Sequence, residues 1–81
     1  MRTTVIIQKR GAGYISTVQG KFGGGHSGAR AGLTAYDAAS RAAHLMIEYA
    51  QTNSEGGSLM APPEVLELVP LHLRSIDGTP G

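Results

Sequence analysis

The pattern of hydrophobic and polar positions predicts two adjoining strands at the start of the chain. Residues 3–8 are β-branched and apolar, a composition that is typical of strands. Gly11 and Gly13 follow, and glycine readily supplies the positive φ angles that a hairpin turn requires. Residues 14–19 then predict a second strand. The small residues 29–33 predict a short third strand beyond a glycine-rich turn.

Residues 35–51 have the period of an amphipathic helix. Thr34 stands at the N-cap position, and Asp37 places a carboxylate in the first turn, where the helix dipole favours negative charge. An apolar stripe runs from Ala35 to Ala50, and polar residues at helical spacing form the opposite face. We expect the alanine-rich first half to lie close to a sheet and the bulkier second half to fill the core.

The residues after the helix predict two more strands. Residues 58–61 form one, and Val65–Val69 form the other, joined by a hairpin through Pro62-Pro63-Glu64. Pro70 can open a short helical turn over residues 71–74.

The predicted fold class is α+β. It is an antiparallel sheet of four to five strands with one helix packed on one face, in the order β-β-β-α-β-β. We expect a single domain over residues 1–76 and a flexible tail over residues 77–81.

Composition narrows the functional classes. The chain has 81 residues, which fit one small domain, and no cysteine, which excludes disulfides, thiolate metal sites and a cysteine nucleophile. The longest apolar run is far shorter than the ~20 residues that a membrane span needs. These features predict a soluble protein in a reducing cytoplasm with no membrane partner.

Charge is unevenly distributed although the net charge is only +1. Residues 1–41 carry six basic residues and one acidic residue, whereas residues 42–81 carry one basic and five acidic residues. A fold that keeps the two halves apart would present a basic face and an acidic face.

No pattern of residues predicts catalysis or a cofactor. Gly23, Gly25 and Gly28 form a G-x-G-x-x-G sequence, but no helix opens directly after it, as nucleotide binding would require. The histidines, His26, His44 and His72, lack ligand spacing for zinc. We therefore predict no catalytic residue, no metal site and no cofactor.

A nucleic-acid-binding module is one alternative. Three strands followed by a helix resemble double-stranded-RNA-binding domains, and the basic residues lie in that half. Against this, the helix opens with Asp37 rather than a lysine cluster, and few aromatic residues are present for stacking. The element order also resembles that of small antitoxins. The alternative is thus a nucleic-acid-binding or regulatory module that uses the basic N-terminal half.

Several short stretches form an ordered set that spans residues 3–76. They are Gly13-Tyr14, Val18, Ala29-Arg30-Ala31-Gly32, Glu48-Tyr49 at the end of the helix, Val65-Leu66, Val69-Pro70 and Leu73-Arg74. In these stretches the chain resembles the fifth-named type I-F anti-CRISPR family, small phage proteins that disable a bacterial type I-F surveillance complex. This chain departs from the family in the turn at 23–28, the loop at 52–57 and the Pro62-Pro63 turn.

The resemblance implies a stoichiometric inhibitor rather than an enzyme, acting in the host bacterial cytoplasm on a protein subunit of the type I-F ribonucleoprotein. Direct nucleic-acid binding is not favoured, and the oligomeric state stays open. Arg30 is the first candidate contact, because it lies in a small-residue stretch where an arginine is well exposed. The other candidate partner-binding residues are Lys9, Arg10, Lys21, Arg41 and Glu48.

Overall fold

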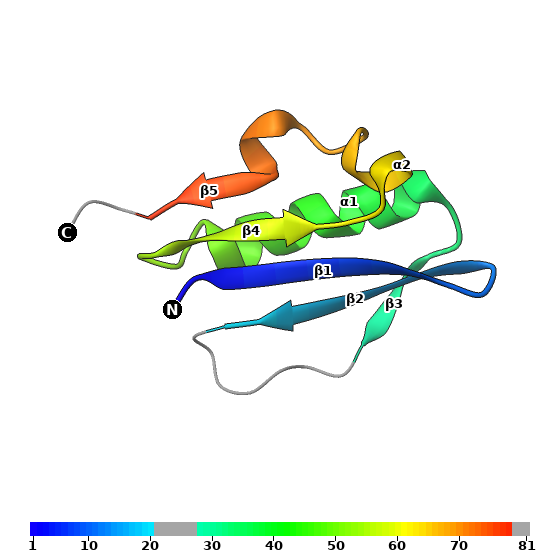
Figure 1. Cartoon of the computed structure of the whole chain (residues 1–81), viewed down its shortest axis with the longest axis horizontal. Coiled ribbons are helices and arrows are strands. Elements are labelled where there is room, and N and C mark those ends of the chain that lie inside the picture. The colour runs from blue at the N-terminus through cyan, green and yellow to red at the C-terminus, as the bar shows by residue number, and fades with distance from the viewer. Residues whose placement is uncertain (21–27, 79–81) are drawn as a thin grey trace.

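The computed structural model describes residues 1–20 and 28–78. It confirms the α+β class and the predicted element order. Five strands form one sheet in the order β3-β2-β1-β4-β5, and the helices lie on one face of it (Figure 1). The strands are β1 (Thr3–Arg10), β2 (Gly13–Gln19), β3 (Ala29–Gly32), β4 (Gly56–Met60) and β5 (Ser75–Asp77).

The sheet is mixed rather than purely antiparallel. β1 pairs with β2 antiparallel, but it pairs with β4 parallel, with Thr3 opposite Gly57 and Ile6 opposite Met60. The cause is the helix between β3 and β4. Its 16 residues span about 24 Å, close to the length of an eight-residue strand, so they return the chain to the end of the sheet where β1 begins.

The helix begins as the sequence predicts. Thr34 Oγ1 accepts a hydrogen bond from the Asp37 amide at 3.1 Å, which caps α1 (Ala35–Leu45). α1 continues directly into η1 (Met46–Ala50), a turn of π-helix in which the Gln51 amide donates to the Met46 carbonyl at 2.9 Å. The predicted apolar stripe is buried or half-buried, and the predicted polar face is exposed.

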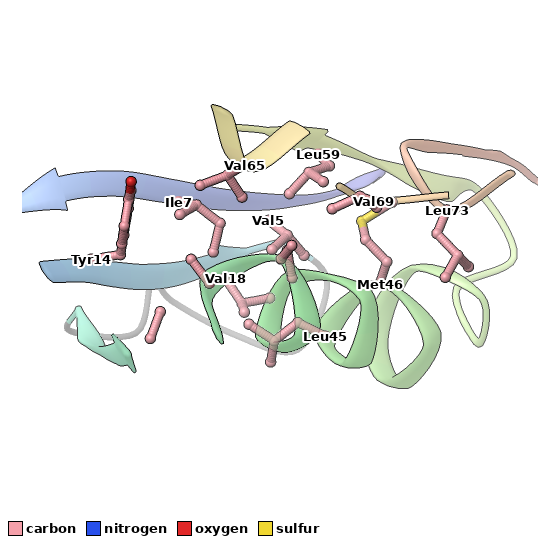
Figure 2. Close-up of a cluster of buried hydrophobic side chains, with 14 of the residues drawn as sticks. Val5, Ile7, Tyr14, Val18, Leu45, Met46, Leu59, Val65, Val69 and Leu73 are labelled. Carbon is pink, nitrogen blue, oxygen red and sulfur yellow. The ribbon is translucent and has the colours of Figure 1, made fainter. Parts of the chain in front are cut away.

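The core lies between the helix and the sheet (Figure 2). α1 contributes Ala38, Ala39 and Ala42, whose small side chains let it lie close to β1 and β2, as predicted. Bulkier side chains fill the remaining volume. They are Val5, Ile7, Tyr14, Val18, Leu45, Met46, Leu59, Val65, Val69 and Leu73.

The prediction of a strand over Val65–Val69, paired in a hairpin, is wrong. The chain forms α2 (Pro63–Leu66) instead, where the Pro62 carbonyl accepts from the Val65 and Leu66 amides at 3.0 and 2.9 Å. Proline is favourable in the first turn of a helix because its missing N–H would have no helical partner there. Pro63 therefore opens a helix rather than preventing one. Val65 and Val69, four residues apart, then point into the core together.

The fifth strand comes later in the chain than predicted. The expected helical turn after Pro70 is present as η2 (Leu71–Leu73), and β5 follows it, paired antiparallel with β4. Asp77, expected in the tail, is the last residue of β5. Residues 79–81 of the expected tail lie outside the described residues.

The loop between the helix and β4 is tied to the start of β1. The buried Asn53 donates to the Met1 carbonyl at 2.8 Å and to Thr3 Oγ1 at 2.9 Å, and its Oδ1 accepts from the Glu55 amide at 2.9 Å. Arg2 donates to the carbonyls of Glu55 and Gly57 at 3.0 and 2.9 Å. The loop after the helix is thus fixed by side chains of its own domain.

Candidate functional site

Two of the predicted contact residues, Arg10 and Arg30, line one pocket. Arg10 ends β1 and Arg30 lies in β3, and β2 separates the two strands in the sheet. The pocket has a volume of about 310 Å³ and opens to solvent at the turn end of the β1–β2 hairpin. Its other lining residues are Ala12, Gly13, Tyr14, Ile15 and Leu33.

The alternation of side chains along the strands explains why these arginines converge. Val5 and Ile7 point toward the helix, so Arg10 lies on the opposite face of the sheet. In β3, Ala31 is buried under the helix, and the adjacent Arg30 therefore also faces away from it. Arg30 stands opposite Ile15 in the register of β2 and β3, and the apolar side chain of Ile15 lines the pocket together with the two arginines.

The connection from β3 to the helix forms the rim of the pocket. Gly32 has a φ of +108°, and a Cβ there would collide with the Cβ of Asp37 in the first turn of α1. Glycine at this position therefore allows β3 to turn directly into the capped helix. The turn leaves Leu33 57% exposed beside Gly13. The pocket is thus bordered by an exposed apolar side chain, that of Leu33.

The other face of the hairpin holds a second cluster. Lys9 Nζ lies 4.6 Å from the centroid of the Tyr14 ring, a cation–π contact. Tyr14 Oη donates a hydrogen bond to Glu64 Oε2 of α2 at 3.0 Å. Burial raises the pKa of the Tyr14 phenol, and the hydrogen bond and the negative charge of Glu64 raise it further. This cluster joins the hairpin to α2 and positions Tyr14, which also lines the pocket.

The remaining predicted contact residues lie apart from the pocket. Arg41 is exposed on the outer face of α1. Glu48, in η1, is exposed and lies 3.5 Å from His44 Nε2. Lys9 belongs to the Tyr14 cluster, and Lys21 lies outside the described residues, as does most of the glycine-rich turn at 23–28. The structure therefore brings together Arg10 and Arg30, but not the whole predicted set.

The strand order separates much of the charge. The basic half of the chain supplies β3, β2 and β1, and the acidic half supplies β4 and β5 (Figure 1). Two other arginines on the described part of the chain donate hydrogen bonds to backbone carbonyls within the domain. Arg2 binds the loop before β4, and Arg74 Nε donates to the Val69 carbonyl at 2.8 Å. Arg10 and Arg30 are the basic residues that line the pocket.

Sequence reasoning missed the surroundings of the two arginines. Leu33 was assigned to a strand, although it lies beyond β3 and borders the pocket. Tyr14 and Glu64 are 50 residues apart, so no local pattern could have paired them. The glycine of Ala31-Gly32 just before the N-cap Thr34 was the available signal for a tight turn at this point.

Within residues 1–20 and 28–78, no group of three or more His, Asp or Glu side chains is placed to hold a metal ion. His26 lies outside this part of the chain. None of the described helices has the length and apolar character to span a bilayer. The sequence matches no model of a known protein family and no curated protein.

Proposed function

We propose that this protein is a phage-encoded anti-CRISPR protein that binds the type I-F surveillance complex and blocks interference stoichiometrically. The observation that carries the proposal is the ordered set of residues over 3–76 that resemble the fifth-named type I-F anti-CRISPR family. Each of these residues is common in proteins, so the support for the resemblance comes from their order and spacing over nearly the whole chain.

Support comes from the place of those residues in the fold. Ala31 is buried, and Gly32 adopts the positive φ that joins β3 to the helix. Val65 and Val69 are fully buried, and Leu73 is nearly so. A resemblance confined to exposed positions would say little about architecture. Here it includes core and turn positions that a shared scaffold would require.

The binding role is supported by the surface next to this scaffold. Arginine and tyrosine are enriched among the residues that dominate protein–protein binding energy. Arg10 and Arg30 supply two arginines that line one pocket, next to the exposed side chain of Leu33. An inhibitor needs no reacting groups in this pocket, only a surface that its target recognises.

Nucleic-acid binding is the second candidate, and the pair of arginines is the observation in its favour. Phosphate binding, however, gains affinity from several cations along a track. Lys9 lies on the other face of the hairpin, Arg41 lies on the helix, and Arg2 and Arg74 are engaged within the fold. The described part of the chain thus concentrates only two cations at the pocket, which favours a protein partner.

Size-exclusion co-elution with a purified type I-F surveillance complex tests the proposal. We expect the protein to co-elute with the complex, and the comparison of samples with and without target DNA to reveal which step is blocked. Failure to co-elute in both states, from a sample whose circular dichroism shows it to be folded, would contradict the proposed target. A steep loss of nucleic-acid binding with salt would instead support the second candidate.

A further inference from the structure

We propose that the pocket between Arg10 and Arg30 binds a carboxylate side chain of the protein partner, with Leu33 packing against apolar atoms beside that carboxylate. Because it takes a protein as the partner, the proposal rests on the proposed function. It adds the chemical class of the group that is recognised and the place where that group binds.

The positive charge of the two arginines in the pocket favours binding of an anion. Two guanidinium groups line one space, and the described part of the chain provides no hydrogen bond or ion pair to either of them. Like charges that share a pocket repel each other, so an anion between them gains attraction from both. Guanidinium groups also match the planar geometry of a carboxylate through paired N–H donors.

The apolar part of the pocket favours a glutamate or aspartate side chain over a phosphate. Ile15, Leu33 and Ala12 line the pocket together with the two arginines. These side chains offer contact to the methylene groups and neighbouring apolar residues of an acidic peptide. A nucleic-acid phosphate is surrounded by polar sugar oxygens and would gain little from them.

The size of the pocket is consistent with a side chain rather than a cofactor. Its volume of about 310 Å³ is at the lower limit of ligand pockets, which extend from roughly 300 to 1,000 Å³. The pocket is also open, so a segment projecting from a large partner can enter without any opening of the hairpin. The Tyr14–Glu64 hydrogen bond holds the turn end of the hairpin against α2, so the pocket is formed before the partner arrives.

A peptide titration tests the pocket without the CRISPR complex. The ¹⁵N-labelled protein is titrated with a capped Leu-Glu-Glu-Leu peptide and, separately, with the matched Leu-Gln-Gln-Leu peptide. We expect NMR shifts centred on the amides of Ile15, Arg30 and Leu33, with a dissociation constant on the order of 1 mM for the acidic peptide. The amide peptide is expected to bind at least about 10-fold more weakly, because it lacks the charge.

Arginine variants locate the binding site. Arg10→Gln and Arg30→Gln should each weaken the acidic peptide by about 10-fold. Arg41→Gln removes an equal charge from the outer face of α1 and should leave the affinity unchanged, which makes it the matched control. Equal binding of the two peptides would overturn the proposal. An equal loss in all three variants would overturn it as well, because it would indicate attraction to net charge alone.

An oligothymidylate titration separates the carboxylate from a phosphate. Shifts at the same amides, with tighter binding than the acidic peptide, would overturn the proposal in favour of nucleic-acid binding. In the co-elution experiment, the Arg10→Gln/Arg30→Gln double variant should lose the complex while Arg41→Gln retains it. If the wild-type protein fails to bind the complex but discriminates between the peptides, the proposed function fails and the carboxylate site stands. If the double variant binds the complex as wild type does, the site fails and the function stands.

Discussion

Replacing Asn53 by alanine should destabilise the domain because this side chain ties the loop after the helix to the first strand. The change removes three hydrogen bonds, those to the Met1 carbonyl, to Thr3 Oγ1 and from the Glu55 amide. A typical intramolecular hydrogen bond contributes about 0.5–1.5 kcal/mol net, so three contribute about 1.5–4.5 kcal/mol. Met1 and Glu55 are exposed and can bond to water instead, whereas Thr3 is fully buried.

These considerations place the loss in the free energy of unfolding at about 2–3 kcal/mol for Asn53→Ala. For a domain of this size, such a loss lowers the Tm by about 10–20 °C. Thermal unfolding followed by circular dichroism measures it. Ser54→Ala is the matched control, because Ser54 is the exposed neighbour in the same loop and should change stability by no more than about 0.5 kcal/mol. The reasoning is refuted if the two variants unfold at the same temperature.

Two further predictions concern the packing and the electrostatics around α2. Val65→Ala deletes two methyl groups from a fully buried side chain and should lower the free energy of unfolding in urea by about 2–3 kcal/mol. Leu68 is half-exposed, so Leu68→Ala should lower it by less than about 1 kcal/mol. Equal losses would contradict the helical placement of this segment in the core. The folded-state pKa of Tyr14 is raised above its ordinary value of 10.0, so the phenol ionises at lower pH in the unfolded chain than in the folded protein. The neutral phenol therefore contributes stability that is fully present below pH 10.0. This contribution is lost as the pH rises through the folded-state pKa. Tyr14→Phe should therefore lose less stability than wild type between pH about 9 and about 11, and Glu64→Gln should lie between the two; an unchanged slope for Tyr14→Phe would contradict this assignment.

The helix could be predicted because its determinants are local. Thr34 at the N-cap and the apolar stripe at a spacing of 3.6 residues lie within one stretch of chain, and both are found as predicted. The segment Val65–Val69 could not be assigned in the same way. A short apolar run suits a strand as well as a buried helical turn, and only the core between α1 and β4 decides between them.

Sheet pairing and the pocket depend on contacts between distant residues. The parallel pairing of β1 and β4 follows from the length of the helix and the end of the sheet at which it stops. Arg10 and Arg30 were each recognised as candidates, but their convergence depends on the register of three strands. Tyr14 was assigned to a strand by its neighbours, while its hydrogen bond to Glu64 required the helix that the sequence did not predict.

The most direct test of the central claim is a titration of type I-F target-DNA cleavage with this protein. The purified surveillance complex and its nuclease are preincubated with increasing amounts of the protein before target DNA is added. A stoichiometric inhibitor predicts that cleavage falls linearly and reaches its minimum at a fixed molar ratio of protein to complex. Undiminished cleavage at a large molar excess, or complete loss at a small fraction of one protein per complex, would contradict it.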